Sequence, residues 1–108
     1  MAIFKKKPIE DAYEKPILLS TGNVYRQYEI IDILIAMDSS TEKWFKAADP
    51  AEAFDGVKNI LRSKCRALDG DAVINCQFEY RMAINADVLA KQVLELFGYG
   101  TAVRFIDE

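Results

Sequence analysis

Two stretches of the chain place apolar residues at every second position, the period of a β-strand. In the first, residues 28–37, β-branched side chains dominate, and one face is expected to carry Ile31, Ile33, Ile35 and Met37. The other face carries Tyr28, Ile30, Leu34 and Ala36 around Asp32. The second stretch begins at Asp71, and its apolar side consists of Ala72, Ile74, Cys76, Phe78 and Tyr80. Both stretches are therefore predicted to be strands.

Between these strands the apolar period changes to that of an α-helix. Asp49 is suited to cap a helix N-terminus, Pro50 to occupy the first turn, and Glu52 to interact with the helix dipole. Apolar residues then recur at i, i+3 and i+4 spacing: Ala53, Phe54, Val57, Ile60, Leu61, Cys65 and Leu68. Gly70 is expected to end the helix. This segment predicts one long amphipathic helix.

Two further strands complete the expected fold. Residues 17–19 form a short apolar run that ends in a turn at residues 20–23. Residues 91–106 predict a long strand that is bulged or bent at Gly98 and Gly100. The order is β-β-α-β-β, so we expect a two-layer α+β fold, an antiparallel sheet with one long helix on one face. Residues 1–16 are expected to be a flexible N-terminal arm and residues 17–108 a single domain.

Two of the predicted strands, residues 28–37 and residues 91–106, are apolar on both faces. In the last strand, Val93 and Phe97 lie opposite Leu94 and Leu96. A strand that is apolar on both sides needs a cover on both sides, and one helix supplies only one of them. We therefore expect other copies of the chain to cover the second sheet face in a ring-like homo-oligomer.

Composition and charge narrow the class of protein. The chain has 108 residues, 51% of them hydrophobic and 29% charged, which is typical of one globular core. A net charge of -3 argues against a nucleic-acid partner, whose phosphates need a basic surface. No segment approaches the roughly 18 apolar residues of a membrane span, and no signal peptide is recognisable. We therefore expect a cytoplasmic protein without a membrane partner, with its two cysteines reduced.

Three segments resemble the YbjQ-like family, an uncharacterised bacterial family labelled heavy-metal-binding. They are the turn Ser20-Thr21-Gly22-Asn23 ahead of Tyr28-Glu29-Ile30-Ile31, the passage Ala67-Leu68-Asp69-Gly70-Asp71-Ala72-Val73-Ile74, and the closing Tyr99-Gly100-Thr101-Ala102-Val103. The resemblance covers residues 17–106 and implies an α+β subunit of dodecin-like topology, assembled into a homopentamer. Residues 39–46 and 85–91 depart from the family pattern. The family has no settled activity, so the resemblance supplies no catalytic residues.

Metal binding is the sharpest chemical hypothesis. The chain has no histidine, so thiolates and carboxylates are the strong metal ligands it offers. Cys65 lies on the apolar stripe of the helix and Cys76 on the core-facing side of its strand. The two cysteines either form a soft-metal site or pack as small hydrophobic side chains in the core. Because free cysteine is among the most buried residue types, the second interpretation is favoured.

Carboxylates and aromatic residues are the remaining candidates. Asp69 and Asp71 flank Gly70 and either stabilise the turn, hold a hard cation or act as an acid and a base. Trp44 and Phe45 are expected to cap the core, to dock on a neighbouring subunit or to stack on a ligand. No nucleophile with an adjacent base is recognisable, so neither catalytic residues nor a cofactor can be assigned.

Together these patterns favour a non-catalytic homo-oligomer, pentameric by its family resemblance, that binds a small ligand or a metal ion in its intersubunit grooves or central opening. The alternative is an enzyme with a carboxylate or tyrosine site at the subunit junction. An aspartate or glutamate in a pocket beside Tyr99 would favour this alternative.

Overall fold

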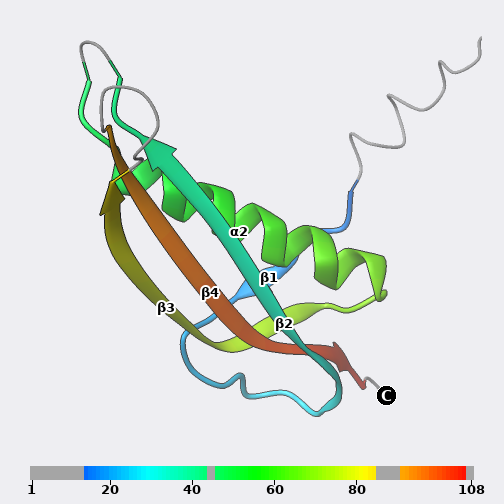
Figure 1. Ribbon diagram of the computed structural model, residues 1–108. Coiled ribbons are helices and arrows are strands. Elements are labelled where there is room, and N and C mark those ends of the chain that lie inside the picture. The colour runs from blue at the N-terminus through cyan, green and yellow to red at the C-terminus, as the bar shows by residue number, and fades with distance from the viewer. Residues whose placement is uncertain (1–13, 44–45, 85–90, 107–108) are drawn as a thin grey trace, which may run out of the picture.

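The computed structural model describes residues 14–43, 46–84 and 91–106 (Figure 1). Trp44, Phe45, residues 85–90 and all but the last three residues of the expected arm lie outside these ranges. The described chain contains four strands and one helix: β1 (Leu18–Leu19), β2 (Tyr28–Thr41), α2 (Pro50–Ala67), β3 (Ala72–Ile84) and β4 (Gln92–Phe105). This confirms the predicted α+β class and the order of the elements.

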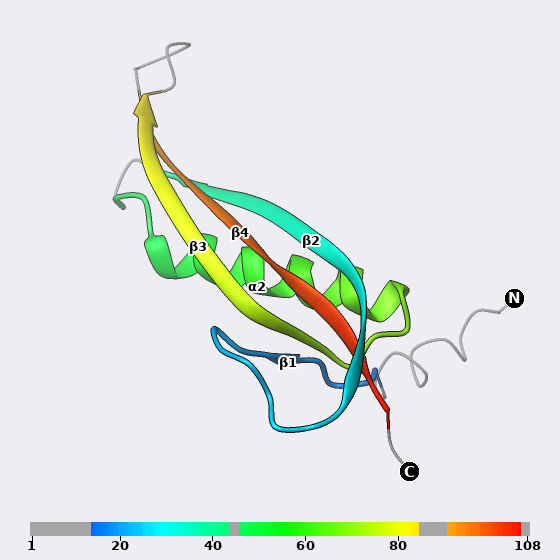
Figure 2. The same ribbon diagram turned by 90° about the horizontal axis from the view of Figure 1, so that it is seen from below.

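The strands form one sheet in the order β1-β3-β4-β2, and α2 covers one of its faces (Figures 1 and 2). The three long strands are antiparallel, as predicted. The short β1 differs, because it pairs in parallel with β3, with Leu18 opposite Ala72. The sheet is therefore mixed. The connection after β1 leads to the opposite edge of the sheet, so no tight hairpin forces β1 into an antiparallel pair.

Helix α2 begins where the sequence predicts and ends differently. The Asp49 side chain accepts a hydrogen bond from the backbone N–H of Ala51 at 3.0 Å, and Pro50 occupies the first turn. At the other end, the left-handed position is taken by Asp69, with φ 60°, and not by Gly70. Gly70 is needed for space instead, because a Cβ there would lie 2.6 Å from the Cys65 sulfur.

The last strand was predicted to be bulged or bent at its two glycines, and the bulge is not found there. β4 stays in register through Gly98 and Gly100, whereas bulges occur in β2 between Ile30 and Asp32 and in β3 between Ile74 and Gln77. The helix explains Gly98, since a Cβ on this residue would lie 2.6 Å from Cγ1 of Val57. The glycine allows α2 to pack closely on the sheet.

The two bulges redistribute side chains between the faces of the sheet. Ile31, predicted to share a face with Ile33, packs against the core under the helix, and Ile30 lies opposite Val103 on the other face. In β3, the bulge at Asn75, with φ 53°, separates Ile74 from Cys76. Each predicted apolar row is thus divided between two faces, because a bulge adds one residue to the two-residue period.

One end of the open face, the sheet face away from α2, is covered by the chain itself. Ala72, Ile74 and Val103 form a second small core cluster there, and Val24 and Tyr28 pack against it. The connection between β1 and β2, which contains Val24, runs past this end of the sheet (Figure 2). The prediction of a cover from outside the chain therefore concerns only the remainder of the open face. Within the described ranges, no helix has both the length and the hydropathy to cross a membrane.

Candidate functional site

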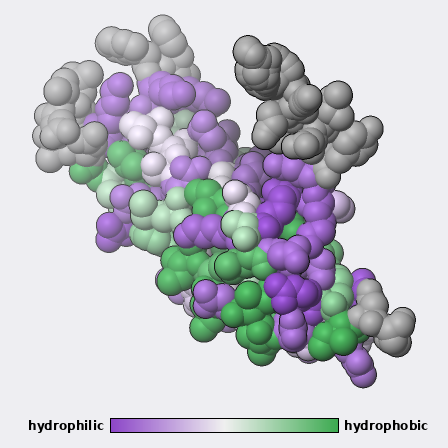
Figure 3. All heavy atoms as spheres, turned by 90° about the vertical axis from the view of Figure 1, so that its right-hand side faces the viewer, coloured by the Kyte–Doolittle hydropathy of each residue, from purple (hydrophilic) through white to green (hydrophobic). Residues whose placement is uncertain are grey.

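Beyond the second core cluster, the open face carries a row of exposed aliphatic side chains on the edge strand β2. We call this row the β2 stripe, and it consists of Ile30, Ile33, Ile35 and Met37, which are 68%, 67%, 63% and 52% exposed. From Ile33 onwards the row follows the two-residue period of the strand, and its neighbours on β4 are Tyr99 and Phe97. Seen from the side on which β2 forms the sheet edge, hydrophobic surface gathers in the lower half of the view, with hydrophilic surface above and beside it (Figure 3).

The half of the open face that lies on β3 is polar. Gln77 is paired with Tyr99 across the strands, and the Tyr99 hydroxyl donates a hydrogen bond to the Gln77 Oε1 atom at 3.2 Å. Farther along, Nε of Arg81 lies 2.6 Å from Oε1 of Glu95. On the open face, the exposed apolar surface of the described residues therefore lies toward β2 and not toward β3.

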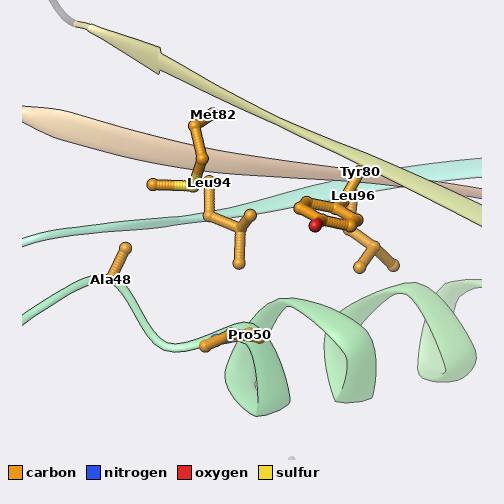
Figure 4. Close-up of a pocket in the computed structure, with 6 residues that line it drawn as sticks. All are labelled: Ala48, Pro50, Tyr80, Met82, Leu94 and Leu96. Atoms are coloured by element: carbon orange, nitrogen blue, oxygen red, sulfur yellow. The ribbon is translucent and has the colours of Figure 1, made fainter.

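A second apolar surface lies on the opposite face, at the end of β3 and β4 beyond the start of the helix. It is a pocket of about 440 Å³, and Figure 4 shows the side chains around it. We call it the strand-end pocket, and its lining is Ala48, Pro50, Tyr80, Met82, Leu94 and Leu96. Leu94 and Leu96 are buried, whereas Tyr80 and Met82 are 68% and 50% exposed. The volume is within the range of about 300–1,000 Å³ that is typical of small-ligand pockets.

The strand-end pocket results from a mismatch of lengths. The 18 residues of α2 span about 27 Å at 1.5 Å per residue, whereas the 13 residues of β3 span about 43 Å. Among the described residues, the helix therefore does not reach the end of the sheet where β3 ends and β4 begins, and it leaves Tyr80 and Met82 exposed there. Tyr80 lies on the helix side together with Cys76 and Phe78, as the alternation of this strand predicts. The pocket itself was not predicted, because the alternation ended at Tyr80 whereas β3 continues to Ile84.

A smaller pocket of about 200 Å³ lies beside β1. Its lining includes Phe54, Lys58 and Cys76. The Lys58 ammonium group lies 3.4 Å from a carboxylate oxygen of Asp55 and 4.5 Å from the centre of the Phe54 ring. Because its cation already has two partners and its volume is below the range for small ligands, this pocket is the weaker candidate.

The two cysteines predicted as metal ligands lie in the same core cluster under the helix. The Cys65 thiol donates a hydrogen bond to the Ala72 carbonyl at 3.5 Å, and the Cys76 thiol donates one to the Val73 carbonyl at 3.4 Å. Burial raises the pKa of both thiols and so favours the protonated form, whereas metal binding needs the thiolate. Among the described residues, no group of three cysteine or carboxylate side chains is placed to hold a metal ion. The thiol metal site stays a prediction.

The two carboxylates predicted as a pair, Asp69 and Asp71, both form ion pairs with Lys15. Nζ of Lys15 lies 3.0 Å from Oδ1 of Asp71 and 3.5 Å from Oδ1 of Asp69. The backbone N–H of Phe105 donates to Oδ2 of Asp71 at 2.7 Å, and this hydrogen bond holds the pKa of Asp71 below its ordinary value. The hydrogen bond to Asp71 in turn raises the pKa of Lys15. These contacts support the turn-stabilising interpretation of the pair.

No family model matches the sequence, and no curated protein sequence matches it either. Among solved structures, the chain is similar to a crystal structure from Pediococcus pentosaceus of a protein with unknown function that belongs to the DUF74 family. The TM-score is 0.67 and the sequence identity 22%, and the match covers 83% of this chain and 98% of that one. The DUF74 family has the YbjQ-like fold, so this neighbour supports the fold that the sequence resemblance implied.

Proposed function

We propose that this chain is a non-catalytic subunit of a homo-oligomeric ring that binds a small ligand or a metal ion in its intersubunit grooves or central opening. The YbjQ-like resemblance supports a ring of five subunits, each of dodecin-like topology. The observation that carries the proposal is the β2 stripe, four large aliphatic side chains that are each more than half exposed. A contiguous exposed apolar patch of a few hundred Å² is often an interaction site.

The size of the stripe is compatible with association. If each of the four side chains buries roughly 100 Å² at about 25 cal/mol per Å², covering the stripe favours association by about 10 kcal/mol. The loss of translational and rotational freedom on association opposes it by roughly 4–15 kcal/mol. The stripe therefore needs an apolar counterpart on the partner, and another copy of this chain offers apolar surface of the same composition.

The enzymatic alternative has less support. The Tyr99 hydroxyl, around which a site was expected, donates to an amide oxygen of Gln77 and not to a carboxylate. The lining of the strand-end pocket offers the Tyr80 hydroxyl but no carboxylate, and Lys58 in the smaller pocket is already paired with Asp55. Ligand binding needs only a complementary surface, whereas catalysis also needs positioned acid, base or nucleophilic groups.

The assembly state tests the proposal. We expect the wild-type protein to sediment as a closed oligomer at micromolar concentration, with one mass by native mass spectrometry. The variant Ile35→Glu adds a charge to the centre of the stripe and is expected to be a folded monomer, because this side chain is 63% exposed in the subunit. The control Gln77→Glu adds the same charge on the polar half of the open face and should assemble like the wild type. A wild-type monomer would contradict the proposal.

A further inference from the structure

The β2 stripe and the strand-end pocket differ in shape and lie on opposite sides of the subunit. The stripe projects from the open face along β2, which forms one edge of the sheet. The pocket is recessed on the helix side, and its exposed wall residues Tyr80 and Met82 belong to β3. Because β1 pairs with β3 only at Ala72 and Val73, this part of β3 forms the other edge of the sheet.

Two such surfaces cannot both be covered by a symmetric pair. A two-fold dimer uses one and the same patch on both subunits, and two surfaces on opposite sides of the subunit cannot both lie in one patch, so one of them stays open. A head-to-tail contact, in contrast, joins the stripe of one copy to the pocket of the next and covers both surfaces in every subunit. Repeated around a circle, this contact closes into a ring.

We propose that the strand-end pocket receives the β2 stripe of a second copy and that this head-to-tail contact builds the ring. The inference rests on the proposed function and specifies which surfaces of the subunits meet. The occupant and the pocket match in chemistry: the stripe is aliphatic, and the pocket lining consists of aliphatic, aromatic and thioether side chains. The flexible thioether of Met82 can adapt to the shape of branched side chains.

The acidic residues of β2 do not belong to the stripe. Asp32 lies opposite Ala102 and Asp38 opposite Leu96, both in the core under the helix, and the Asp38 carboxyl lies against Gly56 of α2. The stripe is therefore aliphatic along its length, and its contact with the pocket is an apolar one.

The edge of β2 is partly closed to the competing contact, in which a second copy would extend the sheet. Oδ1 of Asp32 accepts the N–H of Ile33 at 2.7 Å, and Oδ1 of Asp38 accepts the N–H of Ser39 at 2.8 Å. Nζ of Lys64 donates to the carbonyl oxygen of Ile35 at 2.8 Å. Side chains thus occupy backbone groups that an added strand would need, which is a common way for proteins to protect sheet edges. Contact through side chains is favoured instead.

The areas agree with a small but complete interface. The four side chains of the stripe offer on the order of 400 Å², about half of the ~800 Å² that each partner contributes to a standard interface. The other half is expected to come from the polar rim, as it does in interfaces of average composition.

The test uses two variants, each blocked on one surface. Ile35→Glu disables the stripe and keeps the pocket, whereas Met82→Glu disables the pocket and keeps the stripe. Met82 is half exposed, so a charge there is compatible with a folded subunit, which circular dichroism verifies. We expect each variant alone to be monomeric and an equimolar mixture to form a 1:1 heterodimer and nothing larger. Its single contact joins the intact stripe of one variant to the intact pocket of the other.

The outcomes separate this inference from the proposed function. A wild-type monomer overturns both. If the wild type assembles and Met82→Glu assembles equally well, the pocket serves another occupant, such as a small molecule, and only the head-to-tail contact is wrong. Failure of the two monomeric variants to form a heterodimer also overturns it. Tyr80→Glu blocks the same pocket wall and replaces Met82→Glu if that variant does not fold, and Gln77→Glu again serves as the control that assembles normally.

Discussion

Adding one methyl group at Gly98 tests how closely the helix packs on the sheet. In Gly98→Ala, the new Cβ would lie 2.6 Å from Cγ1 of Val57 and 2.9 Å from Cδ1 of Phe78. Ordinary contacts between carbon atoms are about 3.5–4.0 Å, so both neighbours or the helix itself must move by roughly 1 Å. Overpacking of this kind typically costs about 1–3 kcal/mol of unfolding free energy. Since Val57 is fully buried, we expect a value in the upper half of that range.

A second substitution identifies the cause of the destabilisation. Val57→Ala alone removes two buried methyl groups and should cost about 2 kcal/mol through lost burial and a cavity. In the double variant, the methyl group at position 98 occupies the space that Val57 vacates. The total cost should therefore be smaller than the sum of the single costs by about 1 kcal/mol or more. The contact with Phe78 persists, so the rescue is incomplete.

Urea unfolding followed by circular dichroism measures these values. The cycle is best performed in the Ile35→Glu background, where we expect a monomer whose unfolding does not depend on protein concentration. Gly22→Ala is the matched control, because a Cβ there has Oγ of Ser20 at 3.9 Å as its nearest neighbour, and its effect should stay within about 0.5 kcal/mol. Additive costs at positions 57 and 98, or a neutral Gly98→Ala, would refute the close packing of α2 on β4.

Two further predictions concern the titratable groups. Asp71→Asn should lower the free energy of unfolding by about 1–2 kcal/mol at neutral pH, because it removes the charged partner of Lys15 and of the Phe105 N–H. Since the folded-state pKa of Asp71 lies below its usual 3.8, this stabilisation is present above that pH and is lost as the pH falls through the folded pKa. The free energy of unfolding from urea titrations should therefore fall less with acidification in the variant than in the wild type. The buried thiols have the opposite effect on the pH dependence of stability, because folding raises their pKa. Thiols of the unfolded chain ionise near pH 9.0 while those of the folded chain stay protonated, so the free energy of unfolding should fall as the pH rises above 9.0. This fall should be smaller in Cys65→Ala. If the proposed metal ion is bound by thiols, metal analysis of reduced protein should show it lost in both Cys65→Ser and Cys76→Ser, and equal retention in both variants would exclude that site.

Helix α2 could be predicted from sequence because its determinants are local. The cap at Asp49, the proline in the first turn and the apolar stripe lie within one continuous segment. The burial of Cys65 and Cys76 followed from the same periodicities. The end of the helix was harder to predict, because Asp69 and not the neighbouring Gly70 adopts the left-handed conformation. Gly70 is needed for space, and part of that space is taken by Ile31 of β2, whose Cδ1 would lie 3.2 Å from a Cβ at position 70. This is a tertiary contact, which a local pattern does not contain.

The bulges could not be predicted, and they determine which residues form the candidate surface. In β2, Ile30 and Ile31 are identical in type, so shifting the two-residue period at this point changes nothing in the pattern of polar and apolar residues. The shift is set by pairing with β4, where Ile30 lies opposite Val103 and Asp32 opposite Ala102. Ile33, Ile35 and Met37 were correctly placed on one face, but Ile30 and not Ile31 joins them.

The close packing of the sheet under α2 also keeps the large side chains of the β2 stripe exposed on the open face. Under the helix the sheet carries small residues, among them Ala36, Gly98 and Gly100, and a Cβ added to either glycine would lie within 2.7 Å of a valine methyl group. A register slip of one residue would turn Ile35 and Met37 into that space, where they do not fit. The large aliphatic side chains of β2 are therefore held on the open face by close packing on the other side. Whatever covers them has to come from outside the described part of the subunit, which is why the assembly state decides among the functions considered for this chain.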